Sequence, residues 1–242
     1  MIELARAAAR FLLPSLCLAC GREPVDEFFR GGVCRACWKT LPSRDLEACA
    51  RCAEALPGAP APALCGRCLL DPPAFGCLRA SAPYRDSARG ILLAFKFRGA
   101  DALGGHLAAE MVRRLERPPC EEIVAVPATA RSRRSRGYHP ADVLADGVAR
   151  RLRLPYARDR LKKIRETEVQ SRVPSTRRTA NVRRAFRVVG SPARRVLLID
   201  DVATSGATAR ECARILTRAG AQTITVWCFA RASRVDVSGI EP

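Results

Sequence analysis

The sequence lacks any apolar segment long enough to cross a membrane or to serve as the core of a secretion signal. The most apolar stretch near the N-terminus, residues 11–13, follows Glu3, Arg6 and Arg10 and is stopped at once by Pro14. A membrane-spanning helix needs about 20 apolar residues, and a signal core needs at least about seven. We therefore expect a cytoplasmic protein with no membrane span.

Aromatic residues and histidines are also scarce. Phe, Trp and Tyr make up 5% of the chain, and only two histidines are present. Few aromatic rings leave few platforms on which the bases of a single nucleic-acid strand could stack. His139 lies in a basic stretch, where we expect a hydrogen-bonding role within a loop and no part in catalysis. No general base and no segment specific for a nucleobase stand out.

Acidic residues are outnumbered by basic ones. The chain has 42 Lys and Arg against 24 Asp and Glu, which gives a formal net charge of +18 at pH 7. This charge predicts attraction to polyanions, such as nucleic acid, anionic lipid or phosphorylated metabolites. The alternative is a basic surface that serves only solubility.

Cysteine, in contrast, is abundant, and eight of the twelve cysteines form four Cys-x-x-Cys pairs. Each pair places two thiolates on one turn, within reach of a tetrahedral zinc ion. Because no secretion signal precedes them, zinc is favoured over disulfides or a redox pair. We predict two structural zinc sites, each shared by two neighbouring pairs, with interleaved pairing as the alternative. The predicted ligands are Cys17, Cys20, Cys34, Cys37, Cys49, Cys52, Cys65 and Cys68.

The composition changes after Pro72 and Pro73, which indicates a domain boundary. Residues 1–76 are predicted to hold a short N-terminal helix, at 2–13, and a double zinc-ribbon module that metal binding stabilises. Residues 77–242 are predicted to form a second domain. The other four cysteines are interpreted as small buried residues; they are Cys77, Cys120, Cys212 and Cys228.

Strand and helix patterns alternate in the second domain, which is typical of an α/β fold with a mostly parallel sheet. Strands are predicted at 78–84, 123–126, 196–199 and 223–230, and helices at 88–97, 102–115 and 141–152. The polar, basic segment 161–186 has no clear period, and we expect a mobile loop there.

The most informative stretch joins an apolar strand, two carboxylates, a turn of small residues and a helix. Residues 196–199 are apolar with β-branched ends, as in a strand buried on both faces. Asp200 and Asp201 follow, and Cys212 and Leu216 then belong to an apolar stripe at helical spacing. An acidic cap on an ordinary strand-to-helix turn would explain one of these residues but not the whole run.

Each part of this stretch has a chemical reason. Ligands of open α/β sheets lie at the carboxyl ends of the strands, and the start of the next helix suits a phosphate. The turn supplies hydroxyl groups, and Gly206 allows a close approach of the backbone. The two carboxylates would repel a phosphate, so they suit ribose hydroxyls or a magnesium ion that holds them. The stretch therefore predicts a site for a sugar phosphate with free hydroxyls.

Four arginines crowd the loop after the predicted strand 123–126: Arg131, Arg133, Arg134 and Arg136. This loop also leaves the carboxyl end of a strand, so it is placed to hold a second anionic group. The alternative is a basic loop that binds nucleic acid.

Residues 196–208 resemble the PRPP-binding signature of type I phosphoribosyltransferases. The resemblance implies that Asp200 and Asp201 contact the ribose hydroxyls and act as the catalytic pair. It also implies that segment 161–186 is the lid over PRPP. The residues implied to bind the phosphates are Thr204, Ser205, Gly206, Ala207 and Thr208, together with Arg136 and Gly137 in a pyrophosphate loop.

Further motifs make the chain similar to the ComF family of competence-associated, phosphoribosyltransferase-like proteins. These are the four cysteine pairs, Cys37-Trp38, Leu41-Pro42, the run 136–139, Gln170-Ser171, Asn181-Val182 and Ala185-Phe186. His139-Pro140 and Thr204-Ser205-Gly206 depart slightly from the family pattern, although Ser205 retains a hydroxyl. The implied fold is a type I phosphoribosyltransferase domain behind a small zinc-ribbon module.

This resemblance implies PRPP with magnesium as ligands and a role in handling single-stranded DNA during natural transformation. Single-stranded DNA and DNA-uptake or recombination proteins are the implied partners. One alternative is a metabolic phosphoribosyltransferase whose acceptor the sequence leaves open. Another is a PRPP-sensing, nucleic-acid-binding module without turnover.

Overall fold

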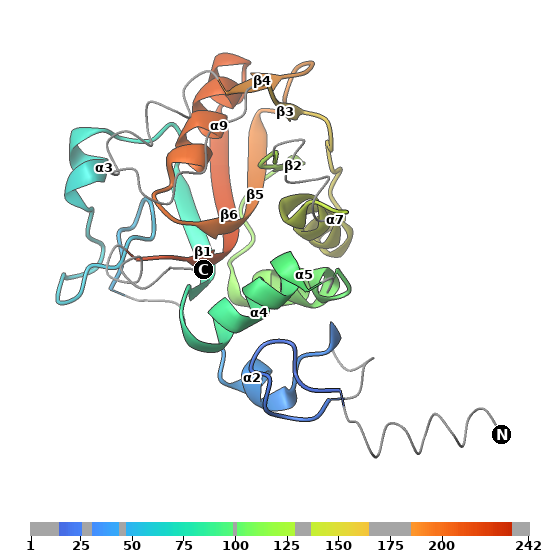
Figure 1. Cartoon of the computed structure of the whole chain (residues 1–242). Helices are drawn as coiled ribbons and strands as arrows, with labels where there is room; N and C mark the ends of the chain where they lie inside the picture. The colour runs from blue at the N-terminus through green and yellow to red at the C-terminus, as the bar shows by residue number, and fades with distance from the viewer. Residues whose placement is uncertain are drawn as a thin grey trace.

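The computed structural model of the chain describes residues 15–25, 31–43, 47–98, 101–128, 137–164 and 185–233. Its centre is a four-stranded sheet of order β1-β6-β5-β2, in which every neighbouring pair is parallel (Figure 1). The strands are β1 (Cys77–Pro83), β2 (Glu122–Ala125), β5 (Arg195–Ala203) and β6 (Thr223–Arg231). The larger helices are α4 (Asp86–Phe97), α5 (Leu103–Arg114), α7 (Pro140–Leu152) and α9 (Ala207–Arg218).

Alternate residues of the central strand β5 face two layers of core. Leu197 and Ile199 pack with residues of α4, α5 and α7. Val196 and Leu198 pack with residues of α9 on the opposite face, as the placement of the helices in Figure 1 indicates. A strand covered on both faces must be apolar on both faces, which explains the unbroken apolar run.

The predicted fold class is confirmed as an α/β protein with a mostly parallel sheet, preceded by a cysteine-rich module. The predicted helices at 88–97, 102–115 and 141–152 correspond to α4, α5 and α7. The strand predicted at 196–199 is longer than expected, because β5 runs to Ala203 and includes Asp200 and Asp201. Pairing with β6 continues along this extension, with Asp200 opposite Cys228, and sustains the strand.

Both ends of the predicted loop 161–186 are strands, so this prediction was wrong there. Strand β3 (Leu161–Lys163) pairs antiparallel with β4 (Phe186–Val188). Leu161 and Phe186 are buried in the same hydrophobic cluster as residues of α9, and this packing holds the two strands against the helix. Three-residue strands are too short to produce a period in the sequence. The remainder of the predicted lid, residues 165–184, lies outside the described residues.

The cysteine-rich part contacts the α/β part in two places (Figure 1). Near helix α2 (Arg35–Lys39), the Ser87 hydroxyl of α4 donates to the carbonyl of Thr40 at 2.9 Å. Farther along the chain, before α3 (Gly66–Leu70), Arg79 of β1 donates to the carbonyl of Ala50 at 2.8 Å. The domain boundary at residue 76 stays a prediction, and the helix predicted at 2–13 lies outside the described residues.

Within the part of the chain that the structure describes, none of the helices has the length and apolar character needed to cross a bilayer.

Candidate functional site

The eight paired cysteines form two clusters. We call Cys17, Cys20, Cys34 and Cys37 the first cysteine cluster, and Cys49, Cys52, Cys65 and Cys68 the second cysteine cluster. Within each cluster the sulfur atoms all lie within 4.8 Å of one another, and none of the twelve cysteines forms a disulfide. Pairing of neighbouring Cys-x-x-Cys motifs is therefore confirmed, and the interleaved and disulfide alternatives are wrong.

The geometry of both clusters fits zinc. The sulfurs of Cys17 and Cys37 are 3.9 Å apart, and those of Cys52 and Cys65 are 3.6 Å apart. Zinc–sulfur bonds of about 2.3 Å in a tetrahedron place sulfur atoms about 3.8 Å apart. Four thiolates with no open position are typical of a structural zinc site, which these clusters would hold.

The four remaining cysteines contribute to neither cluster. Cys212 and Cys228 are fully buried, as expected of small core residues. Cys77 and Cys120 are only half-buried, so the expectation of burial was wrong for these two.

The acidic pair lies at the carboxyl end of β5, and a lysine that the sequence analysis did not assign to the site contacts it. The ammonium nitrogen of Lys96, in the last turn of α4, is 2.7 Å from a carboxylate oxygen of Asp201. Asp201 continues the alternation of Leu197 and Ile199, which face α4. Lys96 is also four residues after the buried Leu92, a spacing that places it on the apolar face of its helix. That spacing is the sequence signal for its place in the site.

The pKa values of the two carboxyl groups diverge. Burial acts to raise the pKa of Asp201, but the charge of Lys96 and the hydrogen bonds from Lys96, Asp200 and the Val202 N–H together outweigh it, so this pKa lies below its ordinary value. Burial, and then the negative charge of Asp201, raise the pKa of Asp200 well above its ordinary value. Burial acts to lower the pKa of Lys96, yet the charge of Asp201, the hydrogen bond that it accepts from Lys96 and the nearby Asp200 together raise it overall. Asp201 is thus the ionised partner of Lys96, and Asp200 is the group that a bound cation would ionise.

Replacing Lys96 with methionine is expected to lower the free energy of unfolding by about 3 kcal/mol at pH 7, because the carboxylate of Asp201 loses its counter-ion. The lowered pKa of Asp201 makes this contribution full above about pH 4, and it disappears as the pH falls through that pKa. The raised pKa of Lys96 keeps it full up to about pH 10, until the pH rises through that pKa. Urea unfolding should therefore show the loss at both pH 6 and pH 9. In an Asp201→Asn background the loss should largely vanish, and an undiminished loss would contradict the pairing.

Residues 204–206 connect β5 to α9, and we call them the β5–α9 loop. Gly206 has φ of +69°, in the left-handed region that favours glycine, and a Cβ there would meet no atom within 4 Å. The backbone conformation at residue 206 therefore explains why glycine is found there, whereas steric crowding does not. The Ser205 hydroxyl accepts a hydrogen bond from the Ala207 N–H at 3.3 Å.

The β5–α9 loop presents hydrogen-bond donors at the start of a helix. Among the described residues, none accepts a hydrogen bond from the backbone N–H groups of Thr204, Ser205 and Gly206. These groups precede the 12-residue helix α9, whose N-terminal end carries a partial positive charge. The arrangement can hold an anion a short distance from the acidic pair, because the loop follows β5 directly.

The basic loop after β2 begins at the same edge of the sheet. The Val126 N–H donates to the Ile199 carbonyl at 2.8 Å, immediately before Asp200. Arg131, Arg133, Arg134 and Arg136 lie outside the described residues. Gly137 is described, with φ of +75°. Nδ1 of His139 accepts from the Asp142 N–H at 3.3 Å and so caps α7, which agrees with the structural role expected for this histidine.

Comparison with known proteins agrees with this architecture. The profile of the double zinc ribbon domain matches residues 8–69. The DNA utilization protein YhgH of Salmonella typhimurium is 30% identical over 90% of this chain and 98% of its own length. Its Escherichia coli K12 counterpart is 31% identical over the same shares. Competence protein F of Haemophilus influenzae is 29% identical over 84% of this chain and 92% of its own length.

The chain belongs to the ComF family. In this ComF-family chain the similarity to its relatives covers the cysteine clusters as well as the sheet, so both parts belong to the shared architecture.

Two solved structures align with about half of this ComF-family chain. Glutamine PRPP amidotransferase from B. subtilis is 21% identical, covering 53% of this chain and 26% of its own, with a TM-score of 0.38. Adenine phosphoribosyltransferase from Thermoanaerobacter pseudethanolicus is 15% identical, covering 56% of this chain and 83% of its own, with a TM-score of 0.33. Scores this low support no conclusion about the site.

Proposed function

We propose that the chain binds PRPP together with Mg²⁺ at the carboxyl edge of its sheet. Asp200 and Asp201 would hold the ribose hydroxyls or the magnesium ion, and residues 204–208 would hold the 5-phosphate. The observation that carries the proposal is the direct succession of a half-buried acidic pair and a loop with uncommitted N–H groups at a helix start. Carboxylates suit hydroxyls and Mg²⁺, and the N–H groups suit a phosphate, so one sugar phosphate satisfies both.

The basic loop is proposed to hold the pyrophosphate of PRPP. It leaves the sheet beside Asp200, because Val126, directly after β2, donates its N–H to the carbonyl of Ile199, the residue before Asp200. In that position Arg136 and Gly137 would face the anomeric side of the ribose, and the arginines would stabilise charge on a leaving pyrophosphate. A transfer would break the bond from the anomeric carbon to pyrophosphate and form one to an acceptor.

We further propose that the chain handles single-stranded DNA, as the names of its relatives, competence protein F and DNA utilization protein, suggest. The net charge of +18 supports contacts to the phosphates of the strand. With aromatic residues at only 5% of the chain, electrostatic contacts would outweigh base stacking. The alternatives are a metabolic transferase, and a module in which PRPP controls DNA binding without turnover.

The dependence of DNA affinity on salt tests the electrostatic part of this proposal. With about four phosphate contacts, affinity for a single-stranded oligonucleotide should fall about fiftyfold between 50 and 200 mM salt. Fluorescence anisotropy with a labelled oligonucleotide of mixed sequence would measure it. An affinity that is indifferent to salt would contradict phosphate contacts.

Calorimetric titration of the zinc-loaded protein with PRPP and Mg²⁺, with and without the oligonucleotide, separates the candidate functions. If the oligonucleotide changes the affinity for PRPP, the two sites are coupled and the DNA-handling role is supported. Binding of PRPP without any such effect favours a metabolic transferase, and pyrophosphate release would then be screened over acceptors. If PRPP does not bind, the proposed site is wrong.

A further inference from the structure

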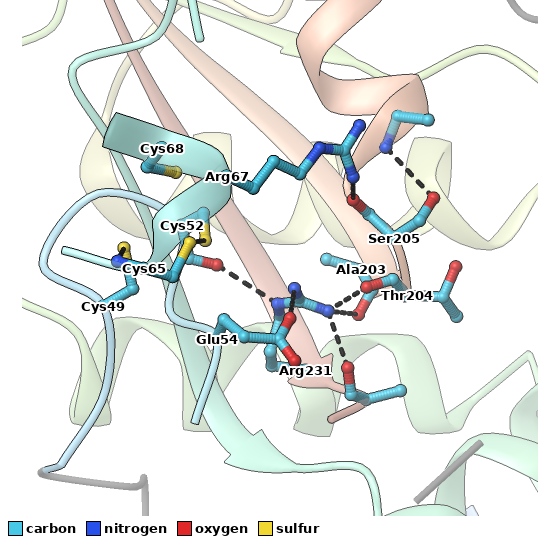
Figure 2. A network of polar contacts seen from close by, with 12 residues as sticks. Cys49, Cys52, Glu54, Cys65, Arg67, Cys68, Ala203, Thr204, Ser205 and Arg231 are labelled. Carbon is cyan, nitrogen blue, oxygen red and sulfur yellow. Dashed lines mark hydrogen bonds and ion pairs between the residues drawn. The ribbon is translucent and has the colours of Figure 1, made fainter. Parts of the chain in front are cut away.

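Three consecutive carbonyl groups, those of Ala203, Thr204 and Ser205, accept hydrogen bonds from arginine side chains. Arg231, at the end of β6, donates from Nη1 to the carbonyl of Ala203 at 3.0 Å and to the carbonyl of Thr204. Arg67, in α3, donates from Nη1 to the carbonyl of Ser205 at 2.8 Å. Figure 2 shows these three consecutive carbonyls with the two guanidinium groups beside them.

Both arginines are anchored in the second cysteine cluster. Arg67 lies between the ligand positions Cys65 and Cys68. Nε of Arg231 donates to the carbonyl of Cys52 at 3.1 Å, and its Nη2 forms an ion pair with Glu54. The side chain of Arg231 is only 7% exposed, and the carboxylate of Glu54 neutralises its charge (Figure 2). Its charge-assisted hydrogen bonds therefore hold the guanidinium group in one position.

The helix after the loop is held by the same cluster. Arg210, in the first turn of α9, donates to the carbonyl of Asp71 at 2.6 Å and approaches the sulfur of Cys68 at 3.4 Å. The second cysteine cluster thus contacts the β5–α9 loop on one side and the start of α9 on the other.

These contacts determine the direction of the donors that the loop presents. A peptide group is planar, and its C=O and N–H point in opposite directions. Each carbonyl shares its peptide group with the N–H of the next residue. Fixing the carbonyls of Ala203, Thr204 and Ser205 therefore also fixes the N–H groups of residues 204–206. Those are the N–H groups with no acceptor among the described residues. A hydrogen bond from a cation to the carbonyl also polarises the peptide and strengthens its N–H as a donor.

We propose that the second cysteine cluster, when it holds zinc, positions the β5–α9 loop for the phosphate of PRPP, with Arg67 and Arg231 as positioning residues. The inference rests on the proposed binding of PRPP. It makes zinc in this cluster and PRPP in the loop mutually stabilising, since coupling between two sites is reciprocal.

The first cysteine cluster provides an internal comparison. Hydrogen bonds connect the segments around the first cluster to α4, α5 and the residue after α4: Arg98 donates to the carbonyl of Leu18, Ser87 to that of Thr40, and Arg114 to those of Leu41 and Pro42. None of these bonds reaches the β5–α9 loop, so PRPP should not change the rate at which the first cluster releases its zinc.

Zinc release tests the coupling without any assay of turnover. A chromogenic chelator should remove both zinc ions from the full-length protein, and saturating PRPP with excess Mg²⁺ should slow the loss of one of them at least about tenfold. The Asp200→Asn/Asp201→Asn variant controls for direct effects of PRPP on the chelator, because PRPP should not protect its zinc.

Arg67→Ala should retain both zinc ions but bind PRPP about tenfold to a hundredfold more weakly by calorimetry, and PRPP should no longer protect its zinc. Arg67→Lys should restore part of the affinity, because a lysine can donate to the same carbonyl. Arg35→Ala, in the corresponding helix α2 of the first cluster, should behave as wild type.

Unchanged PRPP affinity in Arg67→Ala would overturn the inference, as would wild-type protein that binds PRPP while both zinc ions leave at their original rates. In both cases the proposed function would survive. If wild-type protein does not bind PRPP, the proposed function fails and the inference fails with it.

Discussion

Replacing Asp200 and Asp201 together with asparagine is expected to weaken the binding of PRPP and Mg²⁺ at least about a hundredfold, to the point of abolishing it in a calorimetric titration. Asparagine retains the shape of aspartate but removes both charges. Each charge-assisted hydrogen bond to a ribose hydroxyl contributes about 1.5–3 kcal/mol, and Mg²⁺ loses its anionic ligands.

Zinc content and folding must be measured beside the titration, because Lys96 loses its ion pair with Asp201 in this variant. Both zinc ions should remain bound, since the cysteine clusters do not involve these carboxylates. Asp159→Asn is the matched control, because Asp159 is 79% exposed and lies outside the proposed site. If the double variant binds PRPP as well as wild type, the assignment of the acidic pair is wrong.

Serine in place of one cysteine of either cluster should remove one of the two zinc ions and unfold the chain around that cluster. Structural zinc sites contribute about 10 kcal/mol or more to folding. Cys34→Ser and Cys65→Ser are comparable changes, because these residues are the N-caps of α2 and α3. Metal analysis and limited proteolysis would measure the outcome.

The two cysteine variants should differ in one respect. Cys65→Ser should also weaken PRPP binding, because Arg67 and Arg231 lose their anchorage in the second cluster, whereas Cys34→Ser should not. Cys77→Ser is the control for the substitution itself, since Cys77 belongs to neither cluster. Retention of both zinc ions in Cys34→Ser and Cys65→Ser would contradict the assignment of structural zinc.

Local patterns were enough to predict the cysteine clusters and the unit from β5 to α9. The Cys-x-x-Cys spacing determines which sulfurs can share an ion, and the apolar run 196–199 marks a strand wherever it lies. The extension of β5 through Asp200 was missed, because charged residues end the apolar pattern while pairing with β6 continues. Strands β3 and β4 were missed because each has only three residues.

Contacts between distant residues could not be derived from such patterns. Lys96 reaches Asp201 only because α4 packs on the face of the sheet toward which Asp201 points. The strand predicted at 223–230 stopped short of Arg231, yet the side chain of Arg231 connects the β5–α9 loop to Glu54 of the cysteine-rich part. Periodicity describes one element at a time, whereas these contacts depend on how the elements pack together.

A crystal structure of the zinc-loaded protein with PRPP and Mg²⁺ would test the central proposal most directly. We predict the 5-phosphate on the N–H groups of residues 204–206, and the ribose hydroxyls or the magnesium ion on Asp200 and Asp201. Ordered PRPP at any other place on the chain, with Asp201 still paired with Lys96, would contradict it.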